Sequence, residues 1–125
     1  MPDTKPADWS RKLADYKRPI LARSIFELML TASALATLWA LGWAAMYFGL
    51  WWLALLLTVP AAVFLVRLFM IQHDCGHGSF FEAKAANDWV GRSIGLLTLT
   101  PYDYWRRTHA IHHATSGNLD RRGLG

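Results

Sequence analysis

The chain has 125 residues, 54% of them apolar, and a formal net charge of +4. This length allows at most one small domain, and the single cysteine excludes a disulfide within the chain. The positive charge does not indicate nucleic-acid binding, because the basic side chains flank an apolar block instead of gathering in one patch. We therefore expect no nucleic-acid partner.

The N-terminal segment, residues 1–20, is polar and contains Pro2, Pro6 and Pro19. We predict that it forms a cytoplasmic tail, with a short helix near residues 8–17 that lies on a membrane surface. Nothing in this segment indicates chemistry.

An apolar block follows, because no Asp, Glu, Lys or Arg occurs from Leu28 to Val66. One membrane span needs about 20 apolar residues, so the sequence predicts two spans, at about 21–48 and 50–71, joined as an antiparallel hairpin. A buried hairpin of a soluble protein is the alternative, but the remaining chain is too short to cover it. Basic residues lie on both flanks and none in the connection, which places the flanks on the cytoplasmic side.

Beyond the second span, the helix is predicted to continue for one or two turns past Arg67, carrying His73 and His77 into the cytosol. Gly76 and Gly78 weaken that helix and are expected to help end it.

After Phe81 we predict a polar turn that contains Asn87 and Asp88, and then an interfacial helix within 89–100. Pro101 is expected to start a further helix, because proline suits the first helical turn. The predicted fold class is an all-α membrane protein, in which a transmembrane helical hairpin precedes interfacial and cytosolic helices.

The histidines are confined to two short stretches. They are His73, His77, His109, His112 and His113. Offsets of three and four residues place side chains on one helix face, and imidazole is a ligand for iron, zinc, copper or nickel. The pattern therefore predicts a metal site, to which all five histidines are candidate ligands.

The type of metal is narrowed by what the two stretches lack. The zinc-protease motif needs a glutamate where Asp74 stands, and a structural zinc site would be expected to use more cysteines than Cys75 alone. We expect Cys75 to be a buried spectator. Soluble di-iron bundles use Glu-x-x-His motifs, which the chain does not contain. An all-imidazole site for more than one iron fits better, although two irons need more ligands than five histidines supply.

These stretches resemble those of a known family. Residues 73–81, His-Asp-Cys-Gly-His-Gly-Ser-Phe-Phe, resemble the first histidine box of the membrane fatty acid desaturases, and residues 109–113, His-Ala-Ile-His-His, resemble the second. The flanks are similar too, with Pro101-Tyr102 and Trp105 before the second box and residues 115–119 after it. The chain resembles the acyl-lipid desaturases of the Δ12/ω-6 branch.

The resemblance implies a helical membrane protein with a cytosolic cap and two non-haem iron ions held by histidines. It implies O₂-dependent insertion of a double bond into an acyl-lipid or other fatty acyl chain. The electrons would come from ferredoxin or a cytochrome b5-type carrier, and membrane lipids would surround the hairpin. Asp74 is expected either to accept a hydrogen bond from a ligating histidine or to be a solvated cap. Arg106 and Arg107 are expected to meet lipid headgroups or an acidic electron carrier, or to serve as a plain anchor.

The family has a third histidine box downstream, which this sequence does not contain. We therefore expect residues 21–125 to be the N-terminal part of a desaturase domain, a fragment that is inactive alone. One alternative is a related histidine-box hydroxylase or ketolase, against which residues 118–120 argue. The other is a non-enzymatic membrane protein that binds a metal.

Overall fold

The computed structural model describes residues 18–118 and residue 120. The described part of the chain contains no strand, and its four α-helices are α2 (Leu21–Tyr47), α3 (Trp51–Gly76), α4 (Lys84–Leu97) and α5 (Tyr102–Thr115). Most of the predicted tail, including the short helix at 8–17, lies outside the described residues.

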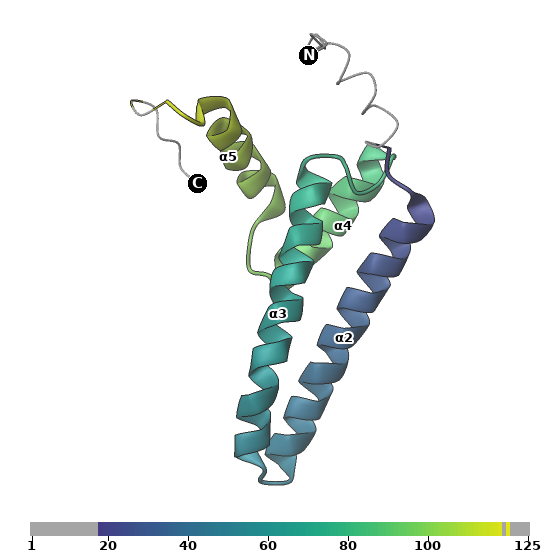
Figure 1. Cartoon of the computed structure of the whole chain (residues 1–125), viewed down its shortest axis with the longest axis vertical. Coiled ribbons are helices and arrows are strands. Elements are labelled where there is room, and N and C mark those ends of the chain that lie inside the picture. The colour runs from purple at the N-terminus through teal and green to yellow at the C-terminus, as the bar shows by residue number, and fades with distance from the viewer. Residues whose placement is uncertain (1–17, 119, 121–125) are drawn as a thin grey trace, which may run out of the picture.

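Helices α2 and α3 form a long antiparallel hairpin (Figure 1). Gly49 makes the tight connection possible, since its φ of +74° belongs to the left-handed region that glycine enters at little cost. Both helices are long and apolar enough to cross a membrane, and large apolar side chains such as Trp43 and Val59 point outward. The expected fold class, an all-helical chain built on an apolar hairpin, is confirmed.

One polar contact joins the two helices of the hairpin. The Arg67 Nε of α3 donates a hydrogen bond to Thr31 Oγ1 of α2 at 3.0 Å. The Thr31 hydroxyl, which is fully buried, in turn donates to the Glu27 carbonyl at 2.7 Å. This contact lies close to the middle of both helices, on the side of the open end, which carries the histidine stretches.

Helix α3 continues past Arg67 and ends at Gly76, with His77 as its C-cap, which agrees with the predicted extension. Gly78 follows with a φ of +69°, so the chain turns away there. Ser24 Oγ of α2 then donates to the Phe80 carbonyl at 2.6 Å, which fixes the loop across the end of the hairpin.

The predicted turn at Asn87 and Asp88 is wrong, because both residues lie inside α4 and both are buried. The helix begins at Lys84, and the Asn87 amide is directed inward. Its oxygen accepts from the Phe81 N–H at 3.0 Å and its nitrogen donates to the Phe81 carbonyl at 2.7 Å. The two polar side chains therefore satisfy buried groups, where local propensity alone favours a turn.

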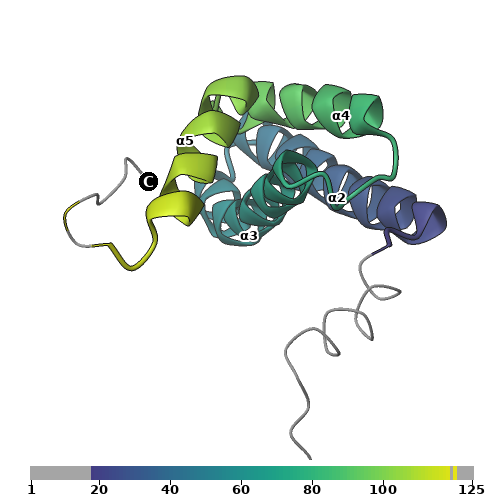
Figure 2. The ribbon, with the colours of Figure 1, turned by 90° about the horizontal axis from the view of Figure 1, so that it is seen from above.

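Helix α4 lies along the hairpin and α5 turns away from it (Figures 1 and 2). Ile94 of α4 is buried in one apolar cluster with Leu35 of α2 and Leu68 of α3. Helix α5 begins directly after Pro101, as predicted, and Tyr102 is its only buried residue.

Candidate metal centre

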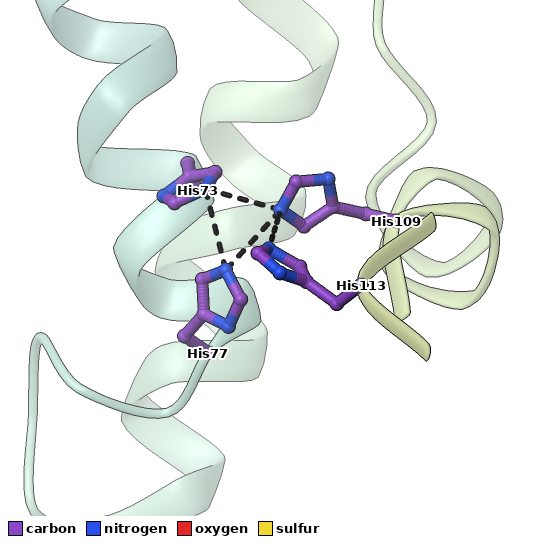
Figure 3. A group of neighbouring side chains, drawn as sticks. All are labelled: His73, His77, His109 and His113. Carbon is purple, nitrogen blue, oxygen red and sulfur yellow. Dashed lines mark hydrogen bonds between the residues drawn. The ribbon is translucent and has the colours of Figure 1, made fainter. Parts of the chain in front are cut away.

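The end of α3 and the second half of α5 bring four histidine side chains together (Figure 3). His73 and His77 come from α3 and its C-cap, and His109 and His113 come from α5. Each side chain offers one ligand nitrogen, and these four atoms all lie within 4.8 Å of one another. The two histidine stretches, 32 residues apart in the sequence, therefore form one cluster.

Three of the Nε2 atoms form a triangle. The distance is 3.3 Å from His73 to His77, 3.2 Å from His77 to His109, and 3.1 Å from His109 to His73. A neutral imidazole nitrogen is either a donor or an acceptor, never both. Hydrogen bonds can therefore satisfy at most two sides of the triangle, and the third side must bring two lone pairs or two protons together.

A metal ion removes this conflict, because a cation attracts all three lone pairs at once. Metal–imidazole bonds are about 2.0–2.1 Å long, so neighbouring ligand nitrogens of one ion are about 3.0–3.4 Å apart. The sides of the triangle match this spacing, and His113 Nε2 lies 3.0 Å from His109 Nε2. The donor set and its geometry therefore fit a metal ion.

The fifth histidine lies at the edge of this cluster. The His112 ring is exposed and its centroid is 6.0 Å from that of His109 and 5.9 Å from that of His113. His112 is not among the four residues whose nitrogens converge. The structure thus brings four of the five predicted ligands together.

Asp74 lies against the first of these rings. His73 Nδ1 and Asp74 Oδ1 are 3.1 Å apart, so a proton on Nδ1 can be donated to the carboxylate. That tautomer leaves the lone pair on Nε2, which is the atom that faces the cluster. The contact is the one expected for a carboxylate that orients a ligating histidine.

The cluster also favours the uncharged form of its histidines. Burial, followed by the neighbouring His73 and His113, lowers the pKa of His77 below its ordinary value. Burial lowers the pKa of His109 as well, and the surrounding histidines add to this effect. Lower pKa values keep these rings neutral near pH 7, and the neutral ring is the form that binds metals.

The indole ring of Trp105 fills the space between the two helices beside the cluster. It stacks on His109 with ring centroids 4.6 Å apart and an interplanar angle of 16°, and its centroid is 5.6 Å from that of His73. A Cβ atom at Gly76 would lie 2.7 Å from the indole. Gly76 therefore leaves room for Trp105, a role beyond ending the helix that the sequence did not indicate.

Asp88 anchors α5 next to the cluster. The turn predicted from the sequence at this position gave no indication of that role. Its carboxylate accepts hydrogen bonds from Lys84 and from Arg106 at 2.7 Å, and the Tyr102 hydroxyl lies 3.4 Å from it. That hydroxyl also lies 3.0 Å from the Cys75 carbonyl of α3, to which it can donate. One buried carboxylate thus joins α4 to α5 and, through Tyr102, to α3.

Cys75 lies between two residues of the cluster in the sequence but faces away from it. It is 1% exposed and packs in the apolar core, and it is not among the residues that converge on the cluster. The expectation that Cys75 is a buried spectator therefore agrees with the structure.

Comparison with known proteins identifies the family. The model of the fatty acid desaturase family matches residues 50–123. The chain is 42% identical over 121 residues to a fatty acid desaturase of Bacillus subtilis (strain 168), which covers 97% of this chain and 34% of that protein. No solved structure matches.

Two further relatives carry electron donors in their names. An sn-1 acyl-lipid omega-3 desaturase (ferredoxin) of Synechocystis is 36% identical over 107 residues, with 86% of this chain and 29% of the relative covered. An acyl-lipid omega-3 desaturase (cytochrome b5), endoplasmic reticulum, of Arabidopsis thaliana is 36% identical over 81 residues, with 65% and 21% covered. The chain spans about a third or less of the length of these relatives. The resemblance noted in the sequence is confirmed, and the chain belongs to the fatty acid desaturase family.

Proposed function

We propose that the whole protein is an O₂-dependent fatty acyl desaturase and that this chain supplies part of its non-haem di-iron centre. The observation that carries the proposal is the triangle of Nε2 atoms of His73, His77 and His109, which hydrogen bonding cannot satisfy and a metal ion can. Membership of the desaturase family supports iron as that metal.

The proposed ligands are the five histidines. His73, His77, His109 and His113 converge on one position, and His112 is proposed as a ligand of the second iron ion from the exposed side of α5. Two ions need more ligands than these five side chains provide. We propose that residues 21–125 are the N-terminal part of a desaturase domain and that residues beyond this chain complete the ligand set.

Iron, when bound, supplies the redox chemistry with O₂ that breaking an unactivated C–H bond requires and that side-chain acids and bases cannot supply. The residues of this chain do the rest. Asp74 holds the His73 ring in the tautomer with a free Nε2 lone pair. Trp105 fixes the His109 ring by stacking and excludes water from one side of the cluster.

The position of the cluster suits a substrate with a long hydrocarbon chain. It lies at the end of an apolar hairpin whose outward faces carry large apolar side chains, so an acyl chain in the surrounding lipid lies next to it. We propose that this end, with the N-terminus and both histidine boxes, lies on the cytoplasmic side, and the basic residues on both flanks of the hairpin support that orientation.

The electron donor is proposed to be ferredoxin or a cytochrome b5-type carrier, because relatives of this chain are named for each. His77 and His113 of the cluster are exposed, so a carrier protein can approach the cluster closely.

The test is to express the complete coding sequence in a host that makes saturated and monounsaturated acyl lipids, and to analyse the acyl chains by mass spectrometry. The expected result is a new acyl species that has lost two hydrogen atoms, formed only with O₂. His109→Ala should abolish it, whereas Ala110→Ser, an exposed neighbour on the same helix, should not.

Two outcomes would overturn the proposal. A product that has gained an oxygen atom would indicate a hydroxylase instead. Full activity of the His109→Ala variant at an unchanged protein level would show that the cluster is not the metal centre.

A further inference from the structure

One buried side chain of α3 holds the turn between α4 and α5. Gln72 is fully buried, and its amide oxygen accepts a hydrogen bond from the Thr98 hydroxyl at 2.8 Å. Its amide nitrogen donates to the Thr100 carbonyl at 3.3 Å. Among the described residues, the other hydrogen bonds of the turn, residues 98–101, stay within the turn and the two helices that it joins. The hydrogen bonds of Gln72 therefore tie this turn to α3.

The turn needs such support because its backbone is strained at one residue. Leu99 has a φ of +54° and is the only residue other than glycine with a positive φ in the described part of the chain. Its side chain is 89% exposed, so packing of that side chain does not offset the strain. A backbone in this region persists only where its surroundings hold it. Gln72 holds Thr98 and Thr100, the residues on either side of Leu99.

The same turn of α3 carries a histidine of the cluster. His73 directly follows Gln72, and consecutive residues of an α-helix point in directions about 100° apart. The two side chains therefore have different neighbours. Gln72 contacts the turn, whereas His73 Nε2 lies 3.1 Å from His109 Nε2 of α5. Because α5 begins at Tyr102, directly after the turn, one turn of α3 fixes both the start of α5 and one ring of the cluster.

A small change in the direction of α5 is enough to separate the rings. His109 lies two helical turns beyond Tyr102, about 10 Å along the helix axis. A tilt of about 10° at the start of the helix moves the backbone of His109 by about 2 Å. Ligand distances in metal sites vary by only about 0.2 Å. The direction in which α5 leaves the turn therefore decides whether its histidines can share an ion with those of α3.

We propose that Gln72 is a positioning residue of the metal centre. Its amide holds the strained turn at Leu99 against α3 and so directs the two converging histidines of α5 toward those of α3. The inference rests on the proposed function of the cluster as a metal centre. It separates two roles, because Asp88 ties α5 to α4 and Gln72 sets the place on α3 from which α5 starts.

The test is a double-mutant cycle that is measured by Co²⁺ titration of the purified chain in detergent. Gln72→Met keeps the length of the side chain but removes both hydrogen bonds. Leu99→Gly removes the strain, because glycine enters the left-handed region at little cost. Thr31→Val is the matched control, since it also removes a fully buried polar group, but one that lies within the hairpin. Far-UV circular dichroism measures the helix content of each variant.

Gln72→Met should lower the Co²⁺ affinity by about tenfold, because the turn is then free to leave its strained conformation. Leu99→Gly alone should change the affinity by less than about twofold, since Gln72 already holds the turn in nearly all molecules. In the Gln72→Met background, the same glycine should restore the affinity to within about threefold of that of the original chain. Thr31→Val should lower the unfolding midpoint and leave the affinity unchanged.

A residue that only fills the core gives no rescue by Leu99→Gly, so a double variant that binds Co²⁺ as weakly as Gln72→Met overturns the inference. An unchanged affinity in Gln72→Met overturns it too, and so does an equal loss in Thr31→Val, which would reflect general stability. If Gln72→Met does not fold, the double variant decides, because it should regain both helix content and Co²⁺ binding. A double variant that stays unfolded overturns the inference.

The same titration of His109→Ala separates this inference from the proposed function. A loss of affinity in His109→Ala with none in Gln72→Met contradicts the inference and leaves the metal centre standing. An unchanged affinity in His109→Ala contradicts the metal centre itself and the inference with it.

Discussion

Neutralising Asp88 should loosen α5 and weaken metal binding without altering any histidine. In Asp88→Asn the side chain keeps its shape but loses its charge, so the hydrogen bonds from Arg106 and Lys84 become uncharged at the acceptor. Hydrogen bonds to charged groups contribute about 1.5–3 kcal/mol and neutral ones about 0.5–1.5. The packing of α5 against α4 should therefore lose about 1–2 kcal/mol of free energy. Tyr102 is then the only buried residue of α5 that holds the helix in place.

The assay is Co²⁺ titration of the purified chain in detergent, followed by the absorption of the bound ion. Where docking of α5 is required for His109 and His113 to meet the other two rings, a loss of 1–2 kcal/mol lowers the apparent affinity by about 5- to 30-fold. Asp103→Asn is the matched control. Like Asp88, Asp103 is a carboxylate that pairs with an arginine, Arg92, but this pair lies at the exposed surface. Exposed pairs contribute little, so Co²⁺ affinity should stay nearly unchanged. Equal effects of the two substitutions would refute the reasoning.

Two further predictions use the same anchor. The hydrogen bond from Lys84 outweighs burial and lowers the pKa of Asp88. The folded chain therefore binds fewer protons at this carboxylate than the unfolded chain, so the stability of the fold should decrease as the pH drops below about 4. Unfolding followed by circular dichroism should show a less steep decrease in Asp88→Asn. Gly91→Ala should lower the free energy of unfolding by about 1–3 kcal/mol and weaken Co²⁺ binding, because the new Cβ would lie 2.2 Å from the Tyr102 ring. Gly42→Ala is the control and should not destabilise the chain, because its Cβ would have no atom within 4 Å. Equal unfolding midpoints of the two variants would contradict the prediction.

Several features of the molecule follow directly from local sequence. The charge-free block from 28 to 66 predicts the hairpin, because so long an apolar segment has few other stable states. Gly76 and Gly78 mark the end of α3, and Pro101 marks the start of α5. The spacing of the histidines predicts which of them share a helix face.

The way the two stretches meet could not be read from the sequence. It depends on contacts between distant residues, such as the Tyr102 ring against Gly91 and the Asp88 carboxylate with Arg106. Local propensity even misplaced Asn87 and Asp88 in a turn, because these residues favour turns unless tertiary partners satisfy them. The outlying position of His112 has the same origin, since the packing of α5 decides which of its histidines face α3.

The central claim is that histidines from both helices hold one metal ion, and X-ray absorption spectroscopy of the Fe²⁺-loaded chain tests it most directly. The structure predicts at least three imidazole nitrogens at about 2.1 Å from the iron, with their multiple-scattering signal reduced both in His77→Ala and in His109→Ala. A spectrum with oxygen ligands alone, or one that either substitution leaves unchanged, would contradict the claim.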